Sequence, residues 1–213
     1  MSAFSSLFNT TEFLLIGHRG AAGLETENTL PSFQRAIDFD CAGIELDVQH
    51  GATAAIPWVI HDKTIDRTTN GHGRVKDLTD AEFSTLRCTN GATIPKLDEV
   101  LDLVAQQSQI LNKSIGINVE LKGPGTASAV AKILQNYPHL PVLVSSFDHS
   151  QLRQFRDIDQ RTDVAPLFHR MAHEVTKSWR SDTRHVVLVL VPTPAWVLSL
   201  CEHAPGLPHG RAA

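Results

Sequence analysis

The chain has 213 residues and a formal net charge of −4, with 42% hydrophobic and 20% charged residues. These proportions are typical of a globular protein with a sizeable core and exclude a disordered chain or a small disulfide scaffold. The mild acidity gives no basic surface for nucleic acid, so we expect no such partner. No run reaches the roughly 18 apolar residues of a membrane span. Residues 1–17 lack Lys and Arg and do not resemble a secretory signal, which predicts a cytoplasmic location.

Short apolar runs with strand character alternate with segments of helical period along the chain. Strands are expected at 13–16, 44–49, 58–60, 115–122, 142–146, 164–168 and 185–191. Helices are expected at 30–37, 97–104, 127–137 and 149–156, the first of them capped by Thr29. No linker divides this order, so we expect a single domain over residues 1–213. The stretch 63–93 is polar and turn-rich, and it is expected to be an insertion with little regular structure.

The alternation of strands and helices predicts an α/β protein with a parallel sheet and helices outside it. An open doubly wound sheet and a closed (β/α)₈ barrel both fit this order. No GxGxxG motif follows the first strand, which disfavours a dinucleotide-binding fold. Polar residues stand at the carboxyl ends of four strands, where TIM barrels build their sites. We therefore predict a TIM (β/α)₈-type barrel.

The strand at 44–49 places two acids on one face. Side chains alternate along a strand, so Glu45 and Asp47 project together, roughly 6 to 7 Å apart, opposite the apolar residues. Two anions this close repel unless a proton or a cation neutralises one of them. A hard divalent ion with oxygen ligands would do so. A surface strand with solvated acids is the alternative, and both interpretations remain open.

The strand at 115–122 repeats this pattern, with Asn118, Glu120 and Lys122 on one face. Glu120 is a third carboxylate that could complete an oxygen site. A metal beside Lys122 indicates a substrate with a phosphate, because both positive centres can hold its non-bridging oxygens. The alternative is an internal salt bridge between Lys122 and Glu120.

Two histidines stand at the carboxyl ends of predicted strands: His18 after the first and His61 after the third. A single histidine of this kind is more often structural, but two fit a general acid and a general base. Arg19 can hold a phosphate through two parallel hydrogen bonds. Glu27 and Asn28 precede the first long helix, and their role as catalytic supports, partners of catalytic groups or helix-start residues stays open.

Several short motifs follow one another in a recognisable order between about residues 15 and 147. Together they resemble the glycerophosphodiester phosphodiesterase family, and most closely its cytosolic bacterial members. No single motif is very specific, but their order and spacing are. The motifs are His18-Arg19-Gly20, Glu27-Asn28-Thr29, Glu45-Leu46-Asp47, His61-Asp62, Arg67-Thr68-Thr69 with Gly71, Ile94-Pro95 before Leu97-Asp98-Glu99, and Glu120-Leu121-Lys122.

This resemblance implies a TIM barrel in which the insertion at 63–93 helps to cover the glycerol end of a small glycerophosphodiester substrate. It implies hydrolysis of that substrate to glycerol 3-phosphate and an alcohol, with Mg²⁺ or Ca²⁺ as cofactor. It also implies a role for each candidate residue: Glu45, Asp47 and Glu120 as metal ligands, His18 and His61 as the acid–base pair, and Arg19 and Lys122 as phosphate ligands.

The chain departs from the family pattern near residue 205. A complete family barrel carries an eighth strand, whereas 193–203 resembles only the preceding helix and 205–213 has no strand character. We therefore expect an incomplete barrel of about seven strands, whose unpaired edge strands promote self-association. Two alternatives to a glycerophosphodiesterase follow. One is an inactive, truncated barrel that acts at most as a binding module, and the other is a phospholipase D-like phosphodiesterase on lysolipids.

Overall fold

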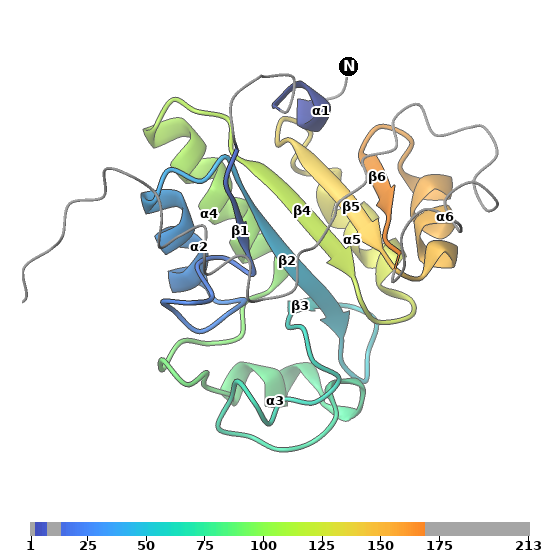
Figure 1. Ribbon diagram of the computed structural model, residues 1–213. Coiled ribbons are helices and arrows are strands. Elements are labelled where there is room, and N and C mark those ends of the chain that lie inside the picture. Colours follow the sequence, from blue (N-terminus) through green and yellow to red (C-terminus); the bar gives the residue numbers. More distant parts are fainter. Residues whose placement is uncertain (1–2, 8–13, 169–213) are drawn as a thin grey trace, which may run out of the picture.

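The computed structural model describes residues 3–7 and 14–168 of the chain, and Figure 1 shows a sheet with its main helices behind it and at its sides. None of the helices in these ranges is long and apolar enough to cross a membrane. In chain order the elements are α1 (Ala3–Leu7), β1 (Ile16–His18), α2 (Leu30–Asp38), β2 (Gly43–His50), β3 (Pro57–Val59), the 3₁₀ helix η1 (Val75–Asp77), α3 (Asp80–Thr85), α4 (Leu97–Ile110), β4 (Gly116–Leu121), α5 (Thr126–Leu134), β5 (Val142–Ser146), α6 (His149–Ile158) and β6 (Asp163–Pro166).

Five strands form a parallel sheet in the order β1-β2-β4-β5-β6. Their alternation with α2, α4, α5 and α6 is the β/α pattern that the sequence predicts. The carboxyl ends of parallel strands meet at one edge, so residues at the ends of β1, β2 and β4 come together there. The strand expected at 185–191, and any strand after it, lie outside the described residues.

The third strand differs from the expected parallel arrangement. β3 pairs with β2 in the antiparallel direction and lies off the main path of the sheet. Only residues 51–56 connect the two strands. A parallel neighbour needs a crossover of a dozen or more residues, so this short connection turns the chain back antiparallel. β3 starts opposite His50, the last residue of β2, and runs back along that strand, so the Ile60 amide donates to the Asp47 carbonyl oxygen and His61 follows near Asp47.

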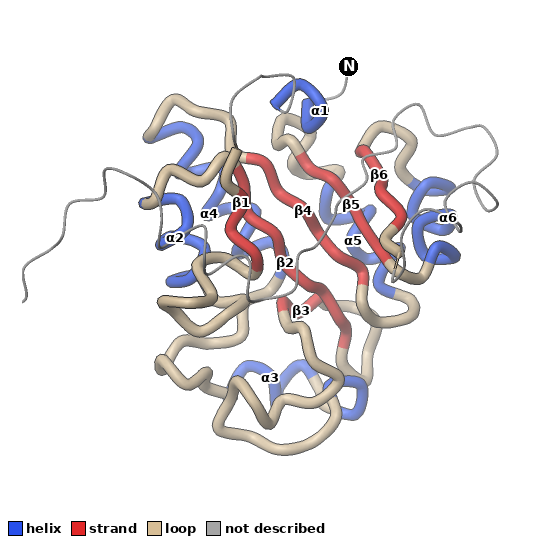
Figure 2. The backbone as a smooth tube through the Cα atoms, viewed as in Figure 1, coloured by secondary structure: helices blue, strands red, loops and turns tan. Residues whose placement is uncertain are grey.

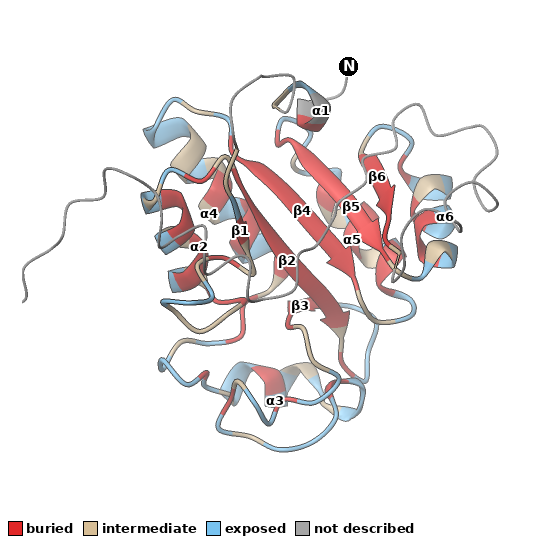
Figure 3. Ribbon diagram, in the orientation of Figure 1, coloured by how far each residue is buried: buried red, intermediate tan, exposed pale blue. Residues whose placement is uncertain are grey.

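The two faces of the central strands carry different side chains, although both are buried, as the red strands of Figure 3 show. One face packs against the helices and forms the apolar core. The other face of β2 and β4 holds buried polar side chains. Strands covered on both faces are typical of parallel sheets. The apolar face includes Ile44, Leu46, Val48, Ile117, Val119 and Leu121, and the polar face includes Glu45, Asp47, Asn118 and Glu120.

Helix α2 begins where the sequence predicts, because the Thr29 side chain accepts a hydrogen bond from the Ser32 amide and Pro31 lies in the first turn. The turn between β1 and α2 requires Gly20. Its φ is +80°, and a Cβ at this position would lie 2.5 Å from the Ser32 hydroxyl oxygen. This close approach brings the end of β1 against the start of α2, and so sets His18 and Arg19 beside Asn28.

The segment 63–93 has more regular structure than its composition suggests, since it contains η1 and α3. Helix α3 begins with a capping box, in which Thr79 accepts from the Glu82 amide and Glu82 accepts from the Thr79 amide. This spacing of Thr and Glu is visible in the sequence. The segment lies beyond the carboxyl end of β2 (Figure 2). Its apolar side chains form a separate cluster with residues of β3, in which the rings of Trp58 and Phe83 stack with their centroids 4.8 Å apart.

Candidate metal and catalytic site

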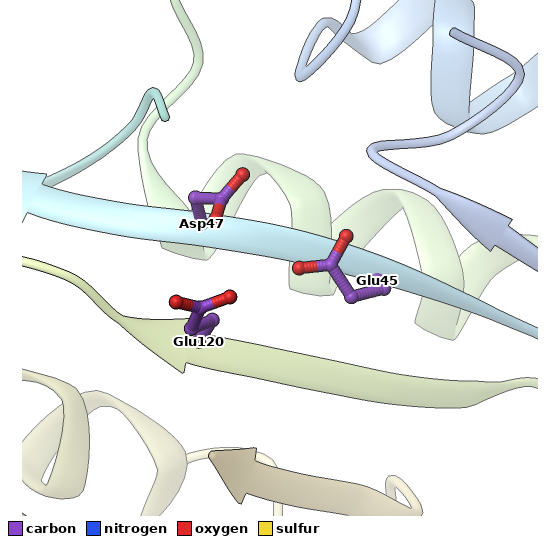
Figure 4. Close-up of side chains that lie close together, drawn as sticks. All are labelled: Glu45, Asp47 and Glu120. Atoms are coloured by element: carbon purple, nitrogen blue, oxygen red, sulfur yellow. The ribbon is translucent and has the colours of Figure 1, made fainter. Parts of the chain in front are cut away.

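Three carboxylates from two neighbouring strands meet on the polar face of the sheet (Figure 4). In the register of β2 and β4, Asp47 stands opposite Glu120 and Glu45 opposite Asn118. One oxygen from each of Glu45, Asp47 and Glu120 lies within 4.8 Å of the others. The exposed fractions of the three residues are 7%, 0% and 7%. This burial excludes the solvated surface strand that the sequence left open.

The electrostatics of this cluster favour a cation. Burial and the charges of Asp47 and Glu120 raise the pKa of Glu45 well above its usual range. Burial and Asp47 also raise the pKa of Glu120. Asp47 Oδ1 and Glu120 Oε1 are buried, and both face the Lys122 ammonium, at 3.5 and 3.0 Å. Carboxylate oxygens arranged in this way fit a hard divalent ion, which prefers oxygen ligands.

Lys122 lies beside the cluster, just after β4. Its Nζ is 3.0 Å from Glu120 Oε1 and 3.5 Å from Asp47 Oδ1. The salt bridge to Glu120, which the sequence offered as an alternative, is therefore present. It does not exclude phosphate binding, because the Lys122 side chain is still 21% exposed.

His18 and Arg19 approach the same cluster from the end of β1. His18 Nε2 is 3.8 Å from Glu45 Oε2, and burial, with Arg19, lowers the pKa of His18. The Arg19 amide donates to Glu45 Oε2 at 3.0 Å, and its guanidinium Nε lies 3.3 Å from Asp47 Oδ2. Arg19 adopts this position with a φ of 55°, a left-handed conformation that is uncommon for residues other than glycine.

His61 reaches the site from the segment after β3. Its Nδ1 lies 2.7 Å from Oδ1 of the neighbouring Asp62. Burial lowers the pKa of His18 and raises that of Glu120, and in each case it is the largest influence. The charge of His61 lowers both pKa values, which indicates that His61 lies near both residues. The structure thus brings all seven predicted site residues to one end of the sheet. Their chemical roles stay predictions.

Asn28 and Glu27, whose roles the sequence left open, are partners of other site residues. The side-chain nitrogen Nδ2 of Asn28 donates to Asp47 Oδ2 at 2.9 Å, and the side-chain oxygen Oδ1 of Asn28 accepts from the Asp47 backbone amide at 3.4 Å. Glu27 Oε1 accepts from Arg19 at 3.0 Å. Asn28 has a φ of 56° and directly precedes the helix cap, so the turn aims its side chain at β2.

Sequence reasoning missed Gln49. Its side-chain nitrogen lies 3.0, 2.9 and 2.8 Å from the carbonyl oxygens of Ile60, His61 and Asp62. It therefore holds the backbone that carries His61. The signal was available, since Gln49 continues the alternation of Glu45 and Asp47 on β2 and so had to share their face.

The fold and this site define a β/α protein with a candidate divalent-metal site at the carboxyl end of its parallel strands. Residues 18–205 match the model of the glycerophosphoryl diester phosphodiesterase family, and the chain belongs to that family. Its relatives include proteins named glycerophosphodiester phosphodiesterase from Bacillus altitudinis, 37% identical over 173 residues, and from Caldanaerobacter subterraneus, 36% identical over 163 residues. These alignments cover 75% and 73% of this chain, which spans 68% and 66% of the two relatives.

The fold is also that of solved family structures. An Oleispira antarctica phosphodiesterase, solved in complex with the product sn-glycerol-3-phosphate, matches with a TM-score of 0.75 at 23% identity. The match covers 95% of this chain and 92% of the Oleispira chain. The Oleispira structure and that of a glycerophosphodiester phosphodiesterase from Agrobacterium tumefaciens, which matches with a TM-score of 0.62, are TIM barrels. This confirms the predicted fold class.

Proposed function

We propose that this chain hydrolyses glycerophosphodiesters to glycerol 3-phosphate and a free alcohol. Family membership gives the reaction class. The observation that carries the proposal is the meeting of three buried carboxylates within 4.8 Å, with His18 and Arg19 in contact with them. The three acids would hold a divalent cation, and that cation together with Arg19 would supply the positive charge that an anionic substrate requires.

In this proposal Glu45, Asp47 and Glu120 hold the divalent ion, Mg²⁺ or Ca²⁺. When bound, such an ion supplies positive charge to phosphoryl oxygens as a Lewis acid. Lys122 now pairs with Glu120 and Asp47, and metal binding would supply those acids with another partner. Lys122 would then face the phosphate, together with the guanidinium of Arg19.

His18 and His61 form the acid–base pair of the proposed reaction. One removes a proton from the attacking oxygen, which belongs either to water or to the glycerol hydroxyl, and the other donates a proton to the departing alcohol oxygen. On the hydroxyl route, water then opens the cyclic phosphate to give glycerol 3-phosphate. Their positions support these roles: His18 lies at the end of β1, 3.8 Å from Glu45, and His61 directly follows Ile60, whose backbone amide donates to the Asp47 carbonyl oxygen. Gln49 and Asp62 fix His61, through its backbone and its ring respectively.

We further propose that residues 1–213 form one domain and that the segment 63–93 covers the glycerol end of the substrate. Two contacts support this position: Thr89 hydrogen-bonds Thr26 at 2.8 Å, and Arg67 binds Glu27. Both tie the segment to the loop before α2, which also carries site residues. The cytoplasmic location stays a prediction, and fractionation of expressing cells would test it.

A coupled assay for glycerol 3-phosphate tests the function. Purified protein is incubated with glycerophosphocholine in the presence of Mg²⁺, Ca²⁺ or a chelator. Metal-dependent release of glycerol 3-phosphate is expected. Metal binding without release would favour the binding module. Release of choline from lysophosphatidylcholine, but not from glycerophosphocholine, would favour the lysolipid enzyme.

A further inference from the structure

The ring of His61 contacts the carboxylate of Asp62, which in turn accepts a hydrogen bond from Arg67. Asp62 Oδ1 lies 2.7 Å from His61 Nδ1. An ionised carboxylate only accepts hydrogen bonds, so Nδ1 carries the hydrogen and Nε2 is left as the atom for proton exchange. β3 ends at Val59, so His61 lies outside any strand and the hydrogen bonds of a sheet do not fix its backbone. Side-chain contacts must therefore orient the ring.

All three nitrogens of the Arg67 guanidinium group donate hydrogen bonds to carboxylates. Its Nε donates to Asp62 Oδ2 at 2.6 Å. Its Nη1 and Nη2 donate to the two oxygens of Glu27, at 2.8 and 2.6 Å. The planar fork of arginine permits this triple contact, which the single ammonium of lysine does not reproduce. Glu27 is in turn bound to Arg19, at 3.0 Å.

The contacts of Arg67 are poor candidates for a purely stabilising role. The Arg67 side chain is 51% exposed, and exposed ion pairs contribute little to folding stability. They do act on Asp62, because hydrogen bonding to Arg67 lowers the pKa of Asp62 to about 2. Asp62 therefore stays ionised, and remains an acceptor for His61 Nδ1, throughout the neutral range.

We propose that Arg67 is a positioning residue, which holds the Asp62 carboxylate against Nδ1 of His61 and thereby leaves Nε2 free to exchange protons with the substrate. The role in turnover rests on the proposed function. Arg67 acts through Asp62, and its anchor is Glu27, 40 residues away in the sequence. The segment 63–93 thus contributes to the acid–base chemistry as well as to the shape of the site.

The test combines kinetics with nitrogen NMR of ¹⁵N-histidine-labelled protein. Arg67→Gln and Asp62→Asn are compared with Arg74→Gln, a control at an exposed arginine of the same segment. A His61→Gln variant assigns the His61 signals. In the wild type, neutral His61 should carry its hydrogen on Nδ1. In Asp62→Asn the new amide can donate to Nδ1, so the hydrogen should move to Nε2. Arg67→Gln should give a mixture of both forms.

For turnover, we expect Arg67→Gln to lower kcat about 10- to 100-fold, the usual effect of losing a group that orients a catalytic residue, with KM near the wild-type value. Arg67→Lys should recover only part of the loss, and Arg74→Gln should behave as wild type. Wild-type kcat and tautomer in Arg67→Gln would overturn the proposal. So would an increase in KM at unchanged kcat, which would make Arg67 a substrate ligand. If the wild-type chain is inactive, the proposed function fails. The NMR measurement of the His61 tautomer then tests by itself whether Arg67 positions Asp62.

Discussion

At the scale of single residues, Glu45 shows that the acidic site lowers the stability of the metal-free fold. It is buried against two other carboxylates, and burial with their charges raises its pKa. Like charges held together oppose folding unless a proton or a cation neutralises them. Residues placed for function often lower stability in this way. Three predictions follow from single side chains of the site.

Glu45→Gln should abolish metal binding without unfolding the protein. The variant removes one like charge, and its amide oxygen can still accept from the Arg19 backbone amide. The melting temperature in chelator should therefore equal or exceed the wild-type value, whereas the rise on addition of Ca²⁺ or Mg²⁺ should disappear. Asp157→Asn, at an exposed carboxylate of α6, is the control. Calorimetric titration that shows wild-type affinity would remove Glu45 from the ligands.

The stabilisation by metal should grow with pH. The folded-state pKa of Glu45 is raised by burial and by Asp47, so the metal-free fold is favoured where Glu45 is protonated and loses stability as the pH rises through that pKa. A bound cation removes this loss, and it must displace the proton at low pH. The difference in melting temperature with and without Ca²⁺ should be larger at pH 8 than at pH 5.5. An equal difference at both values would contradict the prediction.

Replacement of either histidine should separate metal binding from turnover. His18→Ala and His61→Ala should each lower kcat by about 10² to 10⁴, the range for loss of a general acid or base. The wild-type rate should depend on pH as a bell, whose limbs report the coupled pair. Calorimetric metal binding should persist in both variants. Full turnover by His61→Ala would show that His61 is structural.

At the scale of secondary-structure elements, the segment 63–93 depends on local signals as well as on packing. Helix α3 is only six residues long, and its capping box supplies partners for its first amides. Phe83 anchors it, fully buried against Trp58. The segment also carries Arg67. Its stability therefore affects the orientation of His61.

Loss of the cap should loosen this segment before the sheet. Thr79→Ala removes the acceptor for the Glu82 amide and should cost about 0.5 to 2 kcal/mol. Hydrogen exchange should accelerate in 80–85 while β2 and β4 keep their protection. Thr85→Ala is the matched control, because its hydroxyl only donates to the Glu82 carbonyl at the other end of the helix. Equal exchange in both variants would mean that the cap contributes nothing.

At the scale of the whole molecule, the site joins segments that are distant in the sequence. Contacts there join β2 to the end of β1, to the loop before α2 and to the end of β4, and join that loop to the segment after β3. The described part of the sheet ends at β1 on one side and β6 on the other. Strand edges offer hydrogen-bonding groups to a further strand.

We expect the chain to self-associate through such edges. Size-exclusion chromatography with light scattering over a range of concentrations would measure this. A mass that rises with concentration is expected. A single monomer mass at every concentration, with a cooperative thermal transition, would contradict the prediction and mean that the edges are covered.

The sequence by itself determined which side chains share a face. Alternation along a strand is a property of covalent geometry, so Glu45 and Asp47, or Glu120 and Lys122, had to project together wherever the strands lay. The order of the motifs then identified the family. The N-cap at Thr29 was readable for the same local reason, and the capping box of α3 was readable but missed.

Only the tertiary structure decided which faces meet. The register that sets Asp47 opposite Glu120 is fixed by the packing of two strands against common helices, and no local pattern encodes it. The antiparallel direction of β3 and the contact of Arg67 with Glu27 have the same origin. The free energy of such long-range contacts is shared by the whole core, so they become fixed only when the chain packs as a unit.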